Sequence, residues 1–115
     1  MHELSIAQSI VECLRTEIGE KTFSKIEVIR MEIGRLAGVS VESLEFSLKV
    51  LLGKRSEIRI LDAKIVEPEV RCYSCKKVYL PEDMIWICPF CGDVRAELIK
   101  GNEIKVIDVE VNDES

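Results

Sequence analysis

Apolar residues near the start of the chain recur at the spacing of an amphipathic helix. The stripe consists of Ile6, Ile10, Leu14 and Ile18, with Ala7 and Val11 beside it. This period predicts one helix over residues 4–18 with a single buried face. A capping box of Ser5 and Gln8 would begin the helix, and Gly19 would end it.

A second stripe predicts a helix over residues 40–52. Its apolar positions are Val41, Leu44, Leu48 and Leu51. Glu42 and Glu45 favour the positive end of a helix dipole, and Gly53 is suited to terminate the helix. Each predicted helix has one apolar face, so we expect both helices to cover a sheet.

Three segments have the alternating apolar pattern of β-strands. They span residues 26–33, 58–65 and 104–111. In each segment the apolar positions change face halfway along the strand. Strict alternation buries one face only, so this change predicts a bulge in each strand or a covering element on the second face.

Composition changes between Pro68 and Lys100. This stretch contains all three prolines, both tyrosines, the only tryptophan and four of the five cysteines. The chain therefore predicts an α+β fold in the order helix, strand, helix, strand, insert, strand. Residues 1–66 and 101–115 would form two helices packed on a small three-stranded sheet, and residues 67–100 would form an inserted zinc-ribbon-like domain.

Charge and hydropathy exclude several classes of function. The net charge of −5 over 115 residues leaves no broad basic surface for phosphates, so nucleic acid is not an expected partner. No apolar stretch approaches a membrane span, and the first twenty residues have the wrong charge order for a secretory signal, so we expect a cytoplasmic protein. The chain offers no Gly-rich phosphate loop and no pair of nucleophile and base, so an enzyme is not expected.

The strongest chemical signal is a set of two Cys-x-x-Cys pairs. The pairs are Cys72 with Cys75, and Cys88 with Cys91. A two-residue spacer lets both sulfurs of a pair face one ion, and two pairs complete a tetrahedral zinc site. Gly92 after the second pair suits the tight turn this requires. Four thiolates leave no open position, so the zinc would be structural and would stabilise an insert too small for its own core.

The spacing of the cysteines does not by itself determine which metal ion they bind. Tetrahedral sulfur does not distinguish zinc from iron, so a rubredoxin-like iron electron carrier stays open as an interpretation. We expect Trp86, Tyr79 and Phe90 to form an apolar shelf around the ion. Four free or disulfide-bonded thiols are the less favoured alternative in a cytoplasmic chain.

The fifth cysteine, Cys13, lies one position off the apolar stripe of the first helix. No cluster of basic residues lies near it in the sequence. We therefore expect a buried and inert thiol without a function of its own.

The only histidine is residue 2. The amine of Met1, the amide nitrogen of His2 and its ring Nδ1 can close two chelate rings around Ni(II) or Cu(II), which favour square-planar nitrogen. Glu3 offers a carboxylate next to them. A histidine near a terminus is more often a solvated side chain, so a zinc-ribbon adaptor that binds another protein remains a second interpretation.

Several motifs together resemble a known family. They are Met1–Ser5, Gly34–Val39, Glu42–Phe46, the two cysteine pairs and Gly101–Glu103. Over essentially its whole length the chain resembles the HypA/HybF nickel metallochaperones of hydrogenase maturation. The resemblance implies that Met1, His2 and Glu3 hold transferable nickel and that the four cysteines hold structural zinc.

The resemblance also implies partners. They are a hydrogenase-maturation GTPase and the hydrogenase large subunit that receives the nickel. Some family members serve urease, which adds urease maturation factors. An insert on short hinges also permits exchange of elements between two copies, and thus a homodimer. No histidine accompanies the cysteine pairs, so coupling of the two metals through such a histidine is not expected here.

Overall fold

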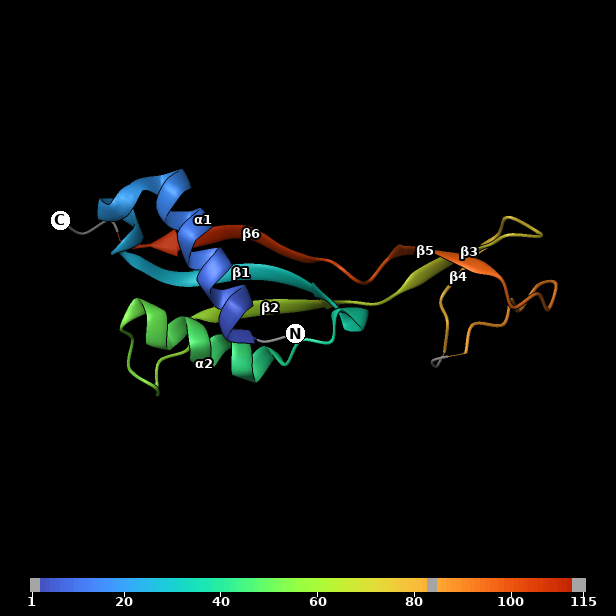
Figure 1. Cartoon of the computed structure of the whole chain (residues 1–115), viewed down its shortest axis with the longest axis horizontal. Helices are drawn as coiled ribbons and strands as arrows, with labels where there is room; N and C mark the ends of the chain where they lie inside the picture. Colours follow the sequence, from blue (N-terminus) through green and yellow to red (C-terminus); the bar gives the residue numbers. More distant parts are fainter. Residues whose placement is uncertain (1–2, 83–84, 113–115) are drawn as a thin grey trace. The chain divides into compact units, whose positions relative to one another are not determined.

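Figure 1 shows the chain as a computed structural model that describes residues 3–82 and 85–112. Its internal contacts divide the chain into two compact units. The first unit comprises residues 1–32, 38–64 and 105–115, and the second comprises residues 33–37 and 65–104. The domain boundaries after residues 66 and 100 that the sequence suggests remain a prediction.

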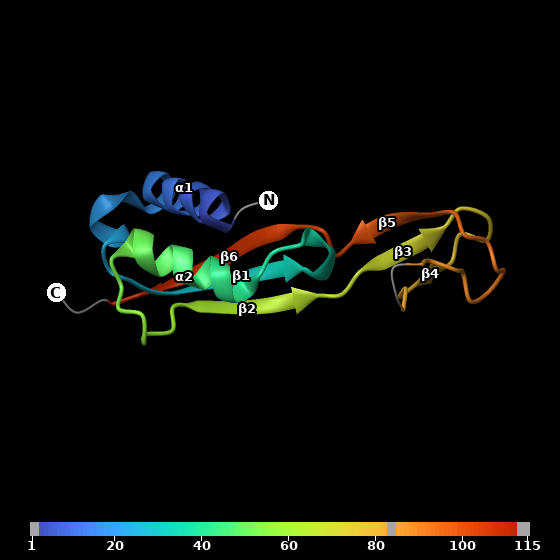
Figure 2. The same cartoon turned by 60° about the horizontal axis from the view of Figure 1, so that its bottom comes forward.

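The first unit places two helices on one side of a sheet (Figure 2). The helices are α1 (Glu3–Phe23) and α2 (Val41–Leu52), and the strands are β1 (Ile26–Gly34), β2 (Leu61–Val66) and β6 (Ile104–Val111). The strand order is β2-β1-β6. These elements confirm the predicted α+β class. In the part of the chain that the structure describes, neither helix is both long and apolar enough to cross a membrane.

The core of this unit lies between the helices and the sheet. Its buried side chains are Ala7, Ile10, Val11, Leu14, Phe23, Ile26, Ile29, Met31, Leu44, Leu48, Ile60 and Leu61. The predicted stripe of the first helix is buried at its centre, while Ile6 and Ile18 at its ends are half-buried. Removing each large aliphatic side chain from water contributes about 1.5 to 3 kcal/mol, so this layer is the main source of the unit's stability.

The helix α2 begins and ends as its sequence predicts. Ser40 is the N-cap, and its Oγ accepts a hydrogen bond from the Ser43 N–H at 3.2 Å. Gly53 adopts a left-handed φ of 67° and donates its N–H to the Val50 carbonyl at 3.3 Å. Both ends therefore have the side-chain and backbone partners that a helix terminus requires.

The helix α1 differs from its prediction at its beginning. It begins at Glu3, so Ser5 lies inside the helix and the predicted capping box with Gln8 is wrong. Gly19 leaves helical geometry with a φ of 82° and a ψ of 158°, so the regular helix is broken at the residue that the sequence predicts. A further helical turn follows the break, and its last residue, Phe23, is buried in the core.

The predicted change of face occurs in β1. Ile26 and Ile29 are both buried although their positions differ by three, which strict alternation does not allow. Arg30 lies between the buried Ile29 and Met31, and its Nε donates to Asp108 Oδ1 at 2.6 Å. The second predicted strand begins later than expected, since Ile58 is exposed and precedes β2.

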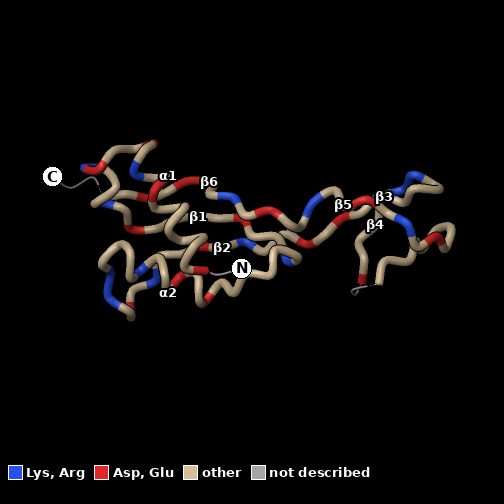
Figure 3. Tube along the Cα trace, in the orientation of Figure 1, with Lys and Arg blue, Asp and Glu red and all other residues tan. Residues whose placement is uncertain are grey.

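The second unit contains a smaller antiparallel sheet of order β4-β3-β5. Its strands are β3 (Glu69–Cys72), β4 (Val78–Tyr79) and β5 (Ala96–Lys100). Ion pairs join β3 and β5, with N···O distances of 3.2 Å for Arg71 with Glu97 and 2.8 Å for Lys100 with Glu69. Figure 3 shows the same interleaving of acidic and basic positions along the trace.

Glu45 of α2 connects the helix to the start of β2, and its loss is expected to destabilise the first unit. Its Oε2 accepts from the backbone N–H groups of Ile60 and Leu61, each at 3.0 Å. Glu45→Ala leaves two N–H groups unsatisfied and is expected to lower the free energy of unfolding by about 2 kcal/mol. Urea denaturation measures this loss, and Glu17→Ala at an exposed position of α1 is the control, expected to change little.

The same carboxylate gives the unit a pH dependence. Burial raises the pKa of Glu45, but the N–H groups of Leu61 and Ile60 outweigh it and hold the pKa below its ordinary value of 4.5. The stabilisation is therefore complete above pH 4.5 and is lost as the pH falls through the folded-state pKa. An acid titration in which Glu45→Gln and the wild type lose stability in parallel would contradict this role.

Candidate metal centre

Two tight turns present the four predicted cysteines. We call residues 72–77 the first knuckle and residues 88–93 the second knuckle. In each knuckle the first cysteine accepts a hydrogen bond from the N–H four residues on and donates to the carbonyl five residues on. The N···O distances are 3.1 and 3.0 Å for Cys72 with Lys76 and Lys77, and 2.9 and 2.9 Å for Cys88 with Gly92 and Asp93. The two knuckles therefore share one backbone geometry.

A left-handed residue closes each knuckle. Gly92 has a φ of 82°, as its sequence position suggests, and Lys76 has a φ of 67° at the equivalent place. Lys76 is not an expected residue at this place, because a side chain disfavours the left-handed conformation by about 1 to 2 kcal/mol. The signal was its position directly after the second cysteine of the pair, which matches that of Gly92.

The knuckles bring the four sulfurs together. The Sγ atoms of Cys72, Cys75, Cys88 and Cys91 all lie within 4.8 Å of one another. The Sγ···Sγ distance is 3.5 Å between Cys72 and Cys91 and 3.6 Å between Cys75 and Cys88. A zinc ion with Zn–S bonds of about 2.3 Å would hold tetrahedral sulfurs about 3.8 Å apart. The cluster therefore fits a zinc ion, and none of its cysteines is in a disulfide.

The backbone around Cys88 favours the thiolate that a metal requires. Burial raises the pKa of this thiol, but N–H groups of Phe90 and Cys91 outweigh burial and lower the pKa to about 7. The Phe90 N–H lies 3.4 Å from the Cys88 sulfur. A donor fixed in this position stabilises negative charge on sulfur whether or not the other thiols are ionised.

Asp93 links the two knuckles, a role that the sequence analysis did not identify. Its Oδ2 accepts from the Ser74 hydroxyl of the first knuckle, and its Oδ1 accepts from the Arg95 backbone N–H at 3.0 Å. Hydrogen bonds from the Arg95 side chain and then from Ser74 hold the pKa of Asp93 well below its ordinary range. An Asp directly after the knuckle glycine, two residues before an arginine, was the available signal.

The aromatic shelf predicted around the ion is only partly present. Tyr79 is buried with Val70 and two of the cysteines, and Trp86 packs against them. Phe90 does not belong to the shelf, because 58% of it is exposed. The Lys77 Nζ lies 4.6 Å from the centre of the Phe90 ring, so the ring faces a cation at the surface.

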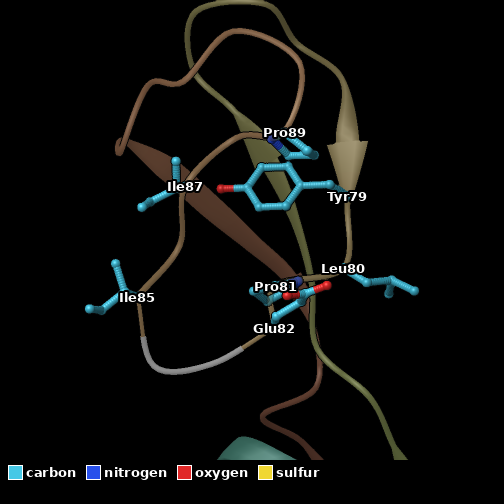
Figure 4. A pocket seen from close by; sticks show the side chains of 7 residues that line it. All are labelled: Tyr79, Leu80, Pro81, Glu82, Ile85, Ile87 and Pro89. Atoms are coloured by element: carbon cyan, nitrogen blue, oxygen red, sulfur yellow. The ribbon is translucent and has the colours of Figure 1, made fainter.

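A cavity of about 420 Å³ borders Tyr79. It is lined by Tyr79, Leu80, Pro81, Glu82, Ile85, Ile87 and Pro89 (Figure 4). The Tyr79 hydroxyl points across the cavity toward Ile87 and has no hydrogen-bond partner among the described residues. Burial, followed by the charges of nearby cysteines, raises the pKa of Tyr79, so the hydroxyl stays protonated.

The structure describes only one of the three predicted nickel ligands, Glu3. Met1 and His2 lie outside the described residues. Glu3 is the first residue of α1, and its Oε2 accepts a hydrogen bond from the Ser40 N–H at 3.0 Å. The carboxylate thus lies at the beginning of α2. Within the described residues, the four cysteines are the only group of three or more potential ligands that could hold a metal ion.

The prediction of a buried Cys13 is wrong. Cys13 is exposed on α1. The buried face of the helix is formed by Ile10, Val11 and Leu14, and Cys13 lies just outside it. A position next to a buried stripe on a surface helix faces solvent unless a second layer covers it.

Comparison with known proteins gives matches along the whole chain. A family model described as hydrogenase/urease nickel incorporation, metallochaperone, hypA matches residues 1–111. The hydrogenase maturation factor HypA of Parabacteroides distasonis is 33% identical over 115 residues, which cover 99% of this chain and 100% of the relative. That of Rhodobacter capsulatus is 35% identical over 115 residues, which cover 96% and 99%.

Solved structures resemble the fold. The solution structure of the Ni metallochaperone HypA from Helicobacter pylori matches with a TM-score of 0.63 and 22% identity, covering 99% of this chain and 100% of that one. A second solution structure of a HypA protein matches with a TM-score of 0.64 and 20% identity, covering 99% and 98%. At this identity the likeness shows the fold alone.

Proposed function

The chain belongs to the HypA family of hydrogenase/urease nickel incorporation metallochaperones, and from this premise we propose that it binds transferable Ni(II) at Met1, His2 and Glu3. Cys72, Cys75, Cys88 and Cys91 hold a structural zinc ion in this proposal. The protein then acts as a carrier that gives up its nickel and not as an enzyme.

The geometry of the cysteine cluster is the reason for assigning the two metals to separate sites. The four sulfurs of the cysteine cluster are close enough to fill a tetrahedral coordination sphere, which leaves no position for a transferable ion. A second metal therefore needs other ligands, and the only histidine of the chain is His2. The amine of Met1 and the nitrogens of His2 supply the donors that Ni(II) prefers. Few ligands at a chain terminus also suit a metal that must be released.

A role in hydrogenase maturation implies contact with the maturation machinery. We propose a maturation GTPase and the hydrogenase large subunit as partners, with urease maturation factors as a further class, and the cytoplasm as the location. A homodimer is compatible with the proposal. The adaptor and iron-carrier interpretations do not account for a family match that includes the N-terminal residues.

A nickel titration of the zinc-loaded protein tests the proposal. The wild type is expected to bind about one Ni(II) per chain, and His2→Ala is expected to bind none, since the substitution removes the ring Nδ1 and with it the second chelate ring. Zinc content measured in the same samples should be equal. Acetylation of the terminal amine is the matched control, because it keeps His2 but removes the amine as a metal donor. Equal nickel binding by all three proteins would leave the N-terminus without a role.

A further inference from the structure

Each knuckle contributes one buried and one more accessible cysteine to the cluster. Cys72 and Cys88 are 0% and 2% exposed, whereas Cys75 is half-buried and Cys91 is exposed. A competing ligand in solution therefore reaches a bound ion from the side of Cys75 and Cys91. The ion is lost when thiolates leave it one after another, so contacts that hold the knuckles together on this side oppose its loss.

Three side chains join the knuckles beside these accessible cysteines. Ser74 directly precedes Cys75, and Asp93 lies two residues after Cys91. The Asp93 Oδ2 accepts from the Ser74 hydroxyl and from the Arg95 Nη2, the latter at 3.0 Å. The Arg95 Nη2 also lies 3.5 Å from the Ser74 Oγ. The Asp93 side chain is 16% exposed, so protein groups rather than water supply most of its hydrogen bonds.

The contacts between the knuckles include the backbone. The Tyr73 N–H of the first knuckle donates to the Arg95 carbonyl at 3.1 Å, and the Cys88 N–H donates to the Asp93 carbonyl at 2.9 Å. None of these bonds uses a cysteine sulfur. The network therefore holds the knuckles beside each other without occupying the sulfur lone pairs that a metal needs.

We propose that Ser74, Asp93 and Arg95 form a clamp that holds the two knuckles together around the zinc ion and sets the rate at which the ion is lost. This inference rests on the proposed zinc in the cysteine cluster and is independent of the terminal nickel site. Thiolates that are already held near one another lose less conformational entropy when they bind a metal, and they separate less readily afterwards.

All three members of the clamp are positioning residues. Both oxygens of Asp93 accept hydrogen bonds, Oδ2 from Ser74 and Oδ1 from the Arg95 N–H. Among the described residues, the group that could surround a metal ion consists of the four cysteines and does not include Asp93. The clamp therefore acts through the backbone that carries the cysteines.

The charge of Asp93 acts against zinc retention, which gives the clamp a test of sign. Four thiolates on one Zn(II) leave a net negative charge, and a nearby carboxylate repels it. If Asp93 acted through its charge alone, Asp93→Asn would slow the loss of zinc. An asparagine side chain has a single acceptor oxygen and cannot accept from both Ser74 and the Arg95 N–H. The clamp therefore predicts that Asp93→Asn speeds the loss of zinc.

The measurement is the rate of zinc transfer from the zinc-loaded protein to an excess of a chromogenic chelator. Ser74→Ala is expected to lose zinc about tenfold faster than the wild type, as the loss of a hydrogen bond behind a metal ligand implies. Ser74→Thr keeps the hydroxyl and should restore the rate to within about twofold. Tyr73→Phe is the matched control, because it removes a hydroxyl of the same knuckle that takes no part in the clamp.

Zinc content and Trp86 emission should be equal in all the zinc-loaded proteins, which separates faster release from a loss of fold. Equal rates for Ser74→Ala and the wild type, or a Ser74→Thr variant as fast as Ser74→Ala, overturn the inference. If Ser74→Ala does not retain zinc, Asp93→Asn decides the question: faster release supports the clamp, and equal or slower release overturns it. A wild type that binds no zinc at all would instead overturn the proposed zinc site, and the clamp with it.

Discussion

Removal of zinc is expected to unfold the second unit while α1 and α2 remain folded. Among the described residues of the second unit, the buried hydrophobic side chains are Ile33, Val70 and Tyr79, beside two of the cysteines, Cys72 and Cys88. Burial of the three side chains other than cysteine contributes about 1.5 to 3 kcal/mol each. A structural zinc ion contributes about 10 to 16 kcal/mol in comparable small modules. The metal therefore exceeds the apolar core of this unit as a source of stability.

Two spectroscopic signals report on the two units separately in this experiment. Trp86 is the only tryptophan and packs against the cluster, so its fluorescence reports on the second unit alone. Far-ultraviolet circular dichroism reports mainly on α1 and α2. We expect a strong chelator to shift the Trp86 emission toward that of a solvated indole with little loss of helix, and Cys88→Ser to behave the same way. Cys13→Ser, outside the cluster, should keep both signals. An unchanged Trp86 emission after complete loss of zinc would contradict the prediction.

The fold could be predicted where local sequence and tertiary packing agree. The helix α2 has an apolar stripe, a capping serine and a terminating glycine, and all three act as expected. The helix α1 departs from its prediction at its beginning, where a distant contact acts. Its first residue, Glu3, binds Ser40, which is 37 positions away. The turn that follows the break at Gly19 ends at Phe23, which is buried in the core. No local pattern contains this information.

The sequence predicts the four cysteine ligands more completely than the residues around them. The spacing of the cysteines is a local constraint, since a two-residue spacer brings both sulfurs of a knuckle to one ion. The link between the knuckles through Ser74 and Asp93 depends on residues 19 positions apart, so spacing alone does not reveal it. Phe90 was misplaced for the same reason, since a two-residue spacer does not fix which way its middle side chains face.

The structure explains why two positions of the family motifs, Gly34 and Gly101, are glycine. A Cβ on Gly34 would lie 2.2 Å from the Gly101 carbonyl carbon and oxygen, and a Cβ on Gly101 would lie 2.5 Å from the Pro68 Cα. Hydrogen bonds hold this junction: the Gly34 N–H donates to the Glu103 carbonyl and the Leu36 N–H to the Gly101 carbonyl, each at 2.8 Å. Backbones this close leave no room for a side chain where the second unit begins and ends in the sequence.

Gly34→Ala is therefore expected to destabilise the protein strongly. Its methyl group would meet backbone atoms that cannot rotate away, so we expect the free energy of unfolding to fall by about 3 kcal/mol or more. Gly38→Ala is the matched control: Gly38 has a φ of +70° but nothing within 4 Å of a Cβ, and its replacement should cost only about 1 to 2 kcal/mol of backbone strain. Urea denaturation measures both losses, followed by Trp86 fluorescence for Gly34→Ala in the second unit and by far-ultraviolet circular dichroism for Gly38→Ala in the first unit. If both variants lost the same free energy of unfolding, a methyl group at position 34 would be tolerated as well as one in an open turn. The close approach of the Gly101 backbone would then not explain the glycine at position 34.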